Sequence, residues 1–377
     1  MKSQILTILI LLITFNACEN PKPTKTTEKA PEATKQPERD KSGYALKPKN
    51  IILMVGDGMG LTQITAGMYM NKNFLNLERM EYIGLSKTYA ADNLVTDSAA
   101  GATAFACGKK TYNGAIGVDV AKKPLKTILE LAEDNGLSTG MVATCVIQHA
   151  TPGSFIAHVD SRHKYEEITE HFLNTPIDIF IGGGQKHFDE RVDKRNLLDS
   201  LRNLGYQVID TTQTWQKEKL ESDKVAIFTA SVQPKPIAKG RKYLKQAATT
   251  AIDFLNKSDK GFFLMIEGSQ IDWGGHANKI DYVVTEMLDF DKTIKEVIDF
   301  VEEDKETLLI ITADHETGGL AINAKSIMNK NIEPGWTTDY HTATMVPVFA
   351  LGPGAENFKG IYENTDIFHK MKKLYGF

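Results

Sequence analysis

Short apolar runs alternate with longer amphipathic stretches along most of this chain. Apolar runs of this length predict buried strands, and apolar positions spaced three or four residues apart predict helices. Such alternation predicts an α/β fold, a three-layer sandwich with a largely parallel central sheet and helices on both faces. The predicted strands are 50–55, 139–146, 177–182, 262–266, 308–312 and 346–351, and the predicted helices include 124–135, 245–255 and 283–301.

The N-terminal residues do not follow this pattern. Residues 5–15 are almost wholly apolar, and the run ends in Asn16-Ala17-Cys18. It is too short to cross a bilayer as a helix, so it is typical of a secretory signal. Its end resembles the motif of bacterial lipoproteins, which predicts a signal peptide over 1–17, a lipid on Cys18 and a periplasmic or cell-envelope location. Cleavage near Ala17 without a lipid is the alternative.

The segment after this signal has the composition of a linker. Residues 19–43 contain no aromatic residue and no Val, Ile, Leu or Met, and prolines lie among Lys, Thr and Glu. Such a segment cannot bury enough apolar surface to offset its ordering entropy. We therefore expect a disordered tether over 18–46. The rest shows no repeat and no internal linker, which predicts one folded domain over 47–377.

The overall composition is that of an ordinary globular protein. The chain has 42% hydrophobic and 24% charged residues, and its formal net charge is 44 − 48 = −4. This charge provides no basic field for nucleic acid, so we expect no nucleic-acid partner. Three cysteines without C-x-x-C spacing do not make a disulfide framework. We expect Cys107 and Cys145 to be buried thiols rather than metal ligands.

Carboxylates and histidines gather where the predicted strands end or begin. Taken singly, each suits a turn or a solvated surface. Ligands in parallel α/β sheets collect at the carboxyl ends of the strands, and so many carboxylates together require cations. Mixed nitrogen and oxygen donors suit Zn²⁺, and the additional carboxylates suit further metals. The residues are Asp57, Glu267, Asp272, His276, Asp314, His315 and His341.

Ser98 is the candidate nucleophile. It precedes an alanine-rich, helix-forming run, so it stands at a helix N-terminus. A plain helix cap is the usual role of a serine there. The same position can hold an anion over the serine oxygen by free N–H groups, and a metal can lower the hydroxyl pKa.

A set of motifs in one order along the chain resembles the alkaline phosphatase family. The motifs are Gly56-Asp57-Gly58-Met59-Gly60, Asp97-Ser98-Ala99-Ala100, His149-Ala150-Thr151-Pro152 with Arg162, Glu267 with Asp272 and His276, and Asp314-His315-Glu316-Thr317-Gly318-Gly319. With His341 they cover the chain from Asn50 to Leu351. The resemblance implies hydrolysis of small phosphate monoesters to an alcohol and inorganic phosphate through a phosphoserine on Ser98.

The resemblance also implies two zinc ions and one magnesium ion. Arg162 would bind two phosphate oxygens, and Asp97 would orient Arg162. The metal ligands divide into three groups. By the resemblance, the groups are Asp272, His276 and His341 for the first zinc, Asp57, Asp314, His315 and Ser98 for the second, and Asp57, Thr151 and Glu267 for magnesium.

Two positions depart from the best-known bacterial pattern of the family. His149 stands where that pattern has Asp near the magnesium, and Trp273 stands where it has Lys beside the first-zinc Asp. These departures leave magnesium affinity and phosphate release open. The short stretch 316–341 and the N-terminal tether leave a homodimer possible but undecided.

Two other functions compete with this interpretation. A sulfatase or phosphodiesterase of the same superfamily could use similar ligands. A sulfatase needs Pro and Arg in a C/S-x-P-x-R run, and this chain has Ala100 and Ala102 at those positions. The phosphodiesterase reading is disfavoured by Thr151 and Glu267, the third-metal group that such enzymes usually lack. The other class is a surface lipoprotein that only binds metal or phosphate, which the nucleophile and Arg162 disfavour.

Overall fold

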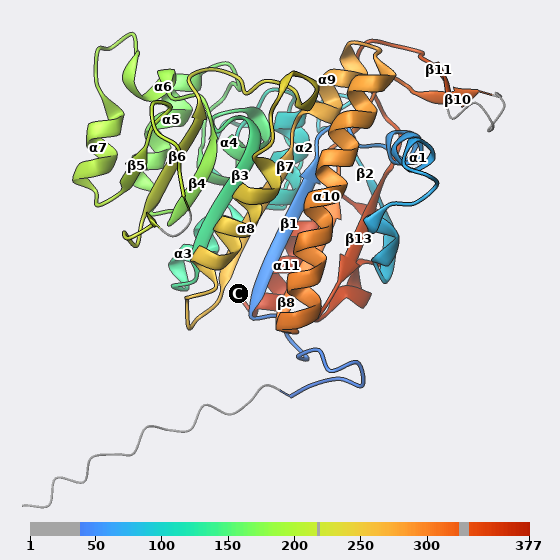
Figure 1. The fold of residues 1–377 in the computed structure, drawn as a ribbon, viewed down its shortest axis with the longest axis horizontal. Helices are drawn as coiled ribbons and strands as arrows, with labels where there is room; N and C mark the ends of the chain where they lie inside the picture. The colour runs from blue at the N-terminus through green and yellow to red at the C-terminus, as the bar shows by residue number, and fades with distance from the viewer. Residues whose placement is uncertain (1–37, 217–218, 324–331) are drawn as a thin grey trace, which may run out of the picture. The chain divides into compact units, whose positions relative to one another are not determined.

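A ten-stranded sheet forms the centre of the protein (Figure 1). The computed structural model describes residues 38–216, 219–323 and 332–377. Neighbouring strands of the sheet pair in parallel except for β13, which is antiparallel to both of its neighbours. In spatial order the strands are β14 (Gly360–Glu363), β2 (Tyr82–Lys87), β13 (Val346–Leu351), β8 (Thr307–Thr312), β1 (Asn50–Gly56), β7 (Phe262–Gly268), β3 (Ser138–Val146), β4 (Ile179–Gly183), β6 (Val225–Ala230) and β5 (Gln207–Ile209). The predicted, largely parallel sheet is confirmed.

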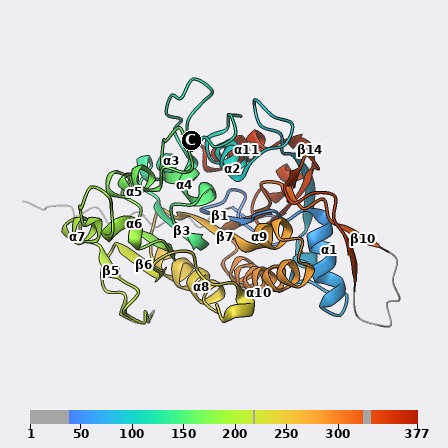
Figure 2. The same ribbon diagram turned by 90° about the horizontal axis from the view of Figure 1, so that it is seen from above.

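Helices cover both faces of this sheet, as Figure 2 shows. Because successive side chains of a strand point to opposite faces, Ile51 and Leu53 of β1 enter one core and Ile52 and Met54 enter the other. Three layers result, as predicted. On one face pack α2 (Ser98–Cys107), α3 (Ile128–Asp134), α4 (Ala150–Ile156), α5 (Tyr165–Asn174), α6 (Lys186–Asp189), α7 (Leu197–Asn203) and α11 (Thr365–Tyr375), and on the other α1 (Leu61–Met70), α8 (Leu244–Leu255), α9 (Gln270–His276) and α10 (Ile280–Asp304).

Local chemistry moves one predicted helix boundary. The helix expected from residue 124 begins at Ile128, because Thr127 caps it and exchanges hydrogen bonds with Glu130. Pro124 instead bridges to Val118 in an extended segment. The strands β2, β5, β6 and β14 were not predicted. The edge strands β5 and β14 are short and β2 is half-exposed, so they carry little apolar signal, whereas β6 has a buried apolar run at Val225–Phe228 that was missed.

The compact unit begins at Glu38, ahead of the expected start at residue 47. Tyr44 is buried there, and the N–H of Ala45 donates to the carbonyl of Lys305. The folded part therefore includes residues expected in the tether. The predicted signal peptide and Cys18 lie outside the described residues. Of the described helices, none combines the length and the apolar composition that a bilayer crossing requires.

Two short strands lie outside the main sheet and order part of the site. β9 (Glu316–Thr317) and β12 (His341–Thr342) pair antiparallel, with His341 opposite Thr317. This pairing brings His341 to the segment that follows β8. A second small ribbon joins β10 (Ala321–Asn323) and β11 (Glu333–Gly335).

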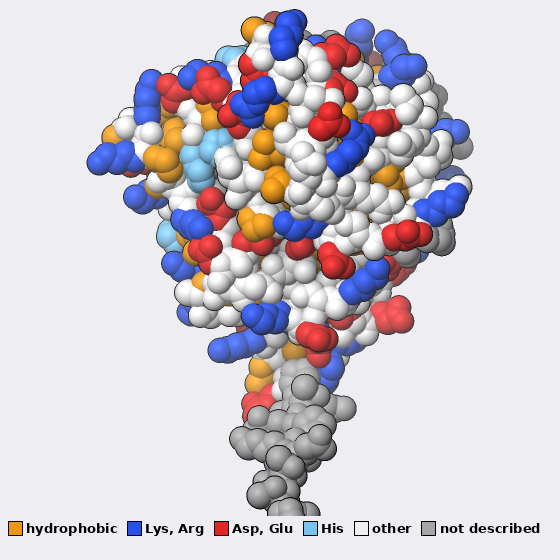
Figure 3. All heavy atoms as spheres, turned by 90° about the vertical axis from the view of Figure 1, so that its left-hand side faces the viewer, with side chains coloured by type: hydrophobic (Ala, Val, Ile, Leu, Met, Phe, Trp, Pro, Cys, Tyr) orange, Lys and Arg blue, Asp and Glu red, His pale blue; other side chains and the backbone are white. Residues whose placement is uncertain are grey.

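On the side of the molecule where β5 forms the edge of the sheet, neither positively nor negatively charged side chains form a patch of their own. Figure 3 shows basic and acidic side chains interspersed over this face, with hydrophobic side chains scattered between them. Such a surface agrees with the near balance of charges in the sequence.

Candidate active site

Three adjacent parallel strands deliver carboxylates to one edge of the sheet. Asp57 follows β1, Glu267 lies near the end of β7, and Asp314 follows β8. Gly58, at φ +71°, turns the chain after Asp57, and its N–H donates to Asp314 Oδ1 at 3.1 Å. A Cβ on Gly58 would lie 2.7 Å from the Cα of Asp272. The close approach of α9 to β1 therefore requires glycine there.

Asp57, Asp314 and His315 form a fully buried group beside Ser98. His315 Nε2 lies 3.5 Å from Asp57 Oδ1, 3.2 Å from Asp314 Oδ2 and 3.3 Å from Ser98 Oγ. Neither oxygen of Asp57 has a hydrogen-bond partner among the described residues, and neither does Asp314 Oδ2. The three side chains offer ligand atoms within 4.8 Å of one another, which suits a cation.

Asp272, His276 and His341 form the second group. Asp272 Oδ1 lies 3.4 Å from His276 Nε2 and 3.5 Å from His341 Nε2. The two Nδ1–H groups donate to backbone carbonyls, of Asp339 at 2.6 Å and of Thr96 at 2.8 Å. Each histidine is thereby oriented with Nε2 toward the shared space, as metal-binding histidines are.

Glu267, His149 and Thr151 form the third group. Both His149 and Thr151 come from the start of α4. Within the described part of the chain, His149 Nδ1, Thr151 Oγ1 and Glu267 Oε1 are buried and have no hydrogen-bond partner. His149 and Glu267 offer ligand atoms within 4.8 Å of each other, and Thr151 lies two residues after His149. The ring of Trp273 lies edge-on to His149, with centroids 6.2 Å apart.

Ser98 begins α2, and Arg162 lies in the turn between α4 and α5. Ser98 is the first residue of α2, but the helix cap is Asp97, whose Oδ1 accepts from the N–H of Ala100 at 2.9 Å. The Ser98 hydroxyl is therefore not used as a cap. Arg162 Nη1 donates to Asp97 Oδ2 at 2.9 Å, so Asp97 joins the serine to the arginine.

Burial and like charge determine the electrostatics of the site. Burial, followed by the repulsion of Asp314, raises the pKa of Asp57 well above its usual range. Burial raises the pKa of Glu267 to about 7. Burial and the nearby Arg162 lower the pKa of His149 to about 3, which leaves a neutral imidazole. Bound cations would relieve the repulsion between these carboxylates and satisfy their unpaired oxygens.

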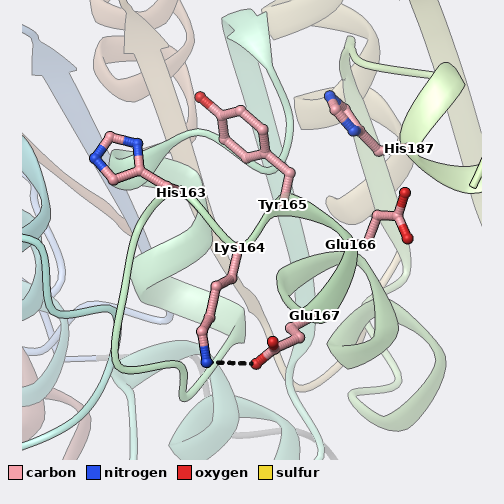
Figure 4. A pocket seen from close by; sticks show the side chains of 6 residues that line it. All are labelled: His163, Lys164, Tyr165, Glu166, Glu167 and His187. Carbon is pink, nitrogen blue, oxygen red and sulfur yellow. Dashed lines mark hydrogen bonds and ion pairs between the residues drawn. The ribbon is translucent and has the colours of Figure 1, made fainter. Parts of the chain in front are cut away.

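Residues 163–167, which follow Arg162 in the sequence, line a pocket of about 290 Å³ together with His187 (Figure 4). The ring of Tyr165 packs on His187, with centroids 4.9 Å apart, and Lys164 pairs with Glu167 at 3.2 Å. No residue that lines it has a buried, unpaired side-chain nitrogen or oxygen, as far as the described residues go. The pocket therefore lacks the unsatisfied ligands that mark the metal groups. Its lining residues are His163, Lys164, Tyr165, Glu166, Glu167 and His187.

Two further side chains belong to the site, although the sequence assigned neither of them a role there. Thr317 Oγ1 donates to Asp272 Oδ1 at 2.5 Å and lies 3.2 Å from His315 Nδ1, so it links two of the groups. Its place two residues after His315 was the available signal. Cys145 Sγ lies 3.3 Å from Glu267 Oε2, beside the third group.

Comparison with known proteins agrees with this arrangement. Alkaline phosphatase 3 of Bacillus subtilis is 35% identical over 91% of this chain and 92% of that protein. The solved alkaline phosphatase of the Antarctic bacterium TAB5 is 43% identical, with a TM-score of 0.84 over 87% of this chain and 98% of that one. A variant of the TAB5 enzyme with a histidine replaced by aspartate was solved with Mg bound in the M3 site, at 42% identity, a TM-score of 0.84 and the same coverage.

The family profile for alkaline phosphatase matches residues 48–333 and 323–377. The first range includes every predicted site residue from Asp57 to His315, and the second adds His341. The match therefore spans the strands, the candidate nucleophile Ser98 and the three candidate metal groups. The chain belongs to the alkaline phosphatase family of metal-dependent enzymes that hydrolyse phosphate monoesters.

Proposed function

We propose that hydrolysis proceeds through a phosphoserine on Ser98, with two zinc ions and a third metal. The position of Ser98 carries the proposal. Its Oγ lies 3.3 Å from His315 Nε2, and Asp97, the helix cap, leaves the hydroxyl free to react. A nucleophile beside a metal-ligand group needs no separate base, since a metal lowers the hydroxyl pKa.

The buried, unpaired oxygens and nitrogens fit the proposed ions. When bound, the ions would supply Lewis-acid stabilisation of the serine oxygen, the leaving group and the hydrolytic water. The residues that would hold them are Asp272, His276 and His341 for the first zinc, Asp57, Asp314, His315 and Ser98 for the second, and Asp57, Thr151 and Glu267 for magnesium.

The chain's own groups would position the phosphate. Arg162 would donate to two non-bridging oxygens, a geometry that a planar guanidinium matches and a lysine does not. Ser98 Oγ would attack phosphorus in line and expel the alcohol, and water would then release inorganic phosphate. We expect broad monoester specificity, because these contacts hold the phosphate and not the leaving alcohol.

One comparison of substrates tests the function. A chromogenic phosphate monoester, a phosphate diester and a sulfate ester are offered to the zinc- and magnesium-loaded protein. We expect hydrolysis of the monoester above the other two. A preference for the diester or the sulfate would support a related metallohydrolase, and no hydrolysis would support a metal- or phosphate-binding lipoprotein.

The phosphoserine has its own test. Acid quenching during turnover should trap phosphate on Ser98, as read by mass spectrometry. Ser98→Ala should abolish this signal and reduce kcat by at least ~10³. Near-normal turnover by a metal-loaded Ser98→Ala protein would contradict the proposal.

We propose that His149 weakens magnesium at the third site. A neutral imidazole adds no charge there, and magnesium prefers oxygen ligands. The solved His-to-Asp variant of the TAB5 phosphatase, which has Mg bound in its M3 site, supports this proposal. Trp273, in edge contact with His149, would fix the orientation of the ring.

We also propose that the protein is exported and anchored to the cell envelope by a lipid on Cys18. The sequence alone supports this, through the apolar run before Asn16-Ala17-Cys18. Two acyl chains on Cys18 would give stable attachment. Cys18→Ala should move the protein to the soluble fraction. A wild-type protein that is soluble after lysis, with no lipid by mass spectrometry, would contradict the anchor.

A further inference from the structure

Cys145 places a thiol inside the third group of candidate ligands. The sequence predicts an inert buried thiol there, and its burial is confirmed. Its Sγ, however, lies 3.3 Å from Glu267 Oε2. Ligand atoms of Cys145, His149 and Glu267 all lie within 4.8 Å of one another.

The neighbouring atoms point to a ligand and not only to packing. His149 Nδ1 and Glu267 Oε1 are buried, and neither has a hydrogen-bond partner among the described residues. The same holds for Thr151 Oγ1. Unpaired polar atoms in a dry interior cost free energy unless something binds them. Two of these residues, His149 and Glu267, are the ones whose ligand atoms lie within 4.8 Å of the Cys145 thiol.

The backbone holds Cys145 rigidly in this position. β3 pairs with β7 in regular register up to Ala143, opposite Glu267. The pairing of β3 with β4 then shifts between Val142 and Val146, and Cys145 lies in that irregular segment. Thr144 and Ser269 exchange two hydrogen bonds, at 2.8 and 3.2 Å, which tie the segment to the end of β7. The thiol is therefore preorganised and not on a mobile loop.

We infer that Cys145 is a metal ligand, which makes the third site of this protein a sulfur, nitrogen and oxygen site. Thiolate, imidazole and carboxylate together are the ligands of Zn²⁺ or Co²⁺, whereas Mg²⁺ takes oxygen ligands. The ion replaces the thiol proton, which leaves to solvent. The inference rests on the third site proposed above and extends it, since it assigns the site to a softer metal than magnesium.

Cobalt provides a direct test, because a thiolate bound to Co²⁺ absorbs in the near ultraviolet by charge transfer. Metal-free protein is titrated with Co²⁺, and the bound ions are counted. Cys107 supplies the control: it is also a buried free thiol, its Sγ lies 3.8 Å from the carbonyl oxygen of Leu125, and among the described residues it belongs to no group of candidate metal ligands. We expect the band as the third ion binds to the wild type and to Cys107→Ser, and no band in Cys145→Ser.

The same variants should differ in metal preference. Cys145→Ser should bind zinc at the third site at least about tenfold more weakly, the loss that even an outer partner of a metal site can cause. X-ray absorption of the zinc-loaded wild type needs no variant, and it should show sulfur at about 2.3 Å.

Three results would overturn the inference. The first is a wild-type protein that binds three Co²⁺ ions without showing the charge-transfer band. The second is a wild-type protein that binds only two Co²⁺ ions. The third is a charge-transfer band that persists in Cys145→Ser. Monoester hydrolysis and the trapped phosphoserine report the proposed function separately. A protein that hydrolyses monoesters and has no sulfur around its metals would therefore refute only the role of Cys145.

Discussion

One carboxylate, Asp97, is hydrogen-bonded to Arg162 and to the helix that carries Ser98. Its Oδ2 accepts from Arg162 Nη1 at 2.9 Å, and its Oδ1 accepts from the N–H groups of Ala100 at 2.9 Å and Gly114 at 3.0 Å. The N–H of Arg162 in turn donates to the carbonyl of Gly114 at 2.7 Å. The guanidinium of Arg162 and the start of the helix that carries Ser98 are thus positioned by one side chain.

Arg162→Lys should weaken inhibition by inorganic phosphate by about 1–3 kcal/mol, because an ammonium cannot reproduce the two-pronged contact. Bound zinc should stay unchanged. The measurement is the inhibition constant for phosphate, with metal analysis of the same samples. Arg202→Lys is the control, since Arg202 pairs with Asp199 on the surface at 2.7 Å. Equal phosphate inhibition in all three proteins would place Arg162 outside the site.

His149→Asp should bind Mg²⁺ more tightly than the wild type and depend on it more for full activity. The substitution adds a negative charge and an oxygen ligand beside Glu267, and magnesium prefers both. Titration of activity and of bound metal against free Mg²⁺ measures the change. His163→Asp, at an exposed histidine near Arg162, is the control. An unchanged or lower Mg²⁺ affinity in His149→Asp would show that His149 does not govern the site.

A buried ion pair joins the segment before α8 to α10. Arg241 Nη2 lies 2.5 Å from Glu286 Oε2 and 2.8 Å from Asp289 Oδ2, and the side chains of Arg241 and Glu286 are each 2% exposed. Glu286→Ala should lower the free energy of unfolding by about 3–5 kcal/mol, because it leaves part of the arginine charge buried without its partner. Urea unfolding measures the loss.

A surface pair between α8 and α10 is the matched control for this prediction. Lys245 of α8 lies 3.4 Å from Glu296 of α10, and both are substantially exposed. Glu296→Ala should cost less than about 1 kcal/mol, as exposed pairs do. If Glu286→Ala and Glu296→Ala lowered the free energy of unfolding by the same amount, burial would not determine the effect of losing an ion pair here.

Glu133 should make stability depend on pH. Burial raises its pKa from 4.5 to about 7 in the folded state, although Thr139 donates a hydrogen bond to it. The folded state therefore holds the Glu133 proton more tightly than the unfolded state does. The resulting contribution of protonated Glu133 to the free energy of unfolding is complete below pH 4.5 and is lost as the pH rises toward 7. Glu133→Gln should therefore be more stable than the wild type at pH 8, by a difference on the order of 1 kcal/mol after solvent screening.

Urea unfolding at pH 5 and pH 8 checks this prediction. The increase in the free energy of unfolding caused by Glu133→Gln should be smaller at pH 5, where the wild-type carboxyl already keeps its proton. Asp134→Asn is the control, since Asp134 is exposed and pairs with Lys126 on the surface. A gain of the same size at both pH values would contradict a raised pKa.

The sequence was sufficient for the parts of the site that follow strands. Asp57, Glu267 and Asp314 could be placed together because parallel strands end at one edge, and the structure brings them there. The central strands are long apolar runs, so their positions were predictable. The edge strands β5 and β14 are short and half-exposed, and no apolar run distinguishes them from loops.

The contacts of Cys145 and Thr317 could not be predicted for a different reason. Cys145 meets Glu267 because the end of β3 lies beside the end of β7, and neither this neighbourhood nor the shifted pairing of β3 with β4 leaves a mark in an apolar pattern. Thr317 lies in β9, which pairs with β12, and it meets Asp272 of α9 across a long separation in sequence. Both contacts depend on pairing between segments that are distant along the chain.

The unpaired oxygens of Asp57 also affect how long the protein survives. Asp314 and His315 reach Asp57 only in the finished sheet, so an ion held by this group, as proposed above, would bind the folded chain and not the unfolded one. Each ion then adds RT ln(1 + [L]/Kd) to the free energy of unfolding, where [L] is the free ion concentration. The unfolded population, and with it the rate of proteolysis through that state, falls as free metal rises. The steady-state abundance of this phosphatase should therefore follow the metal supply of its surroundings, in addition to any control of its synthesis.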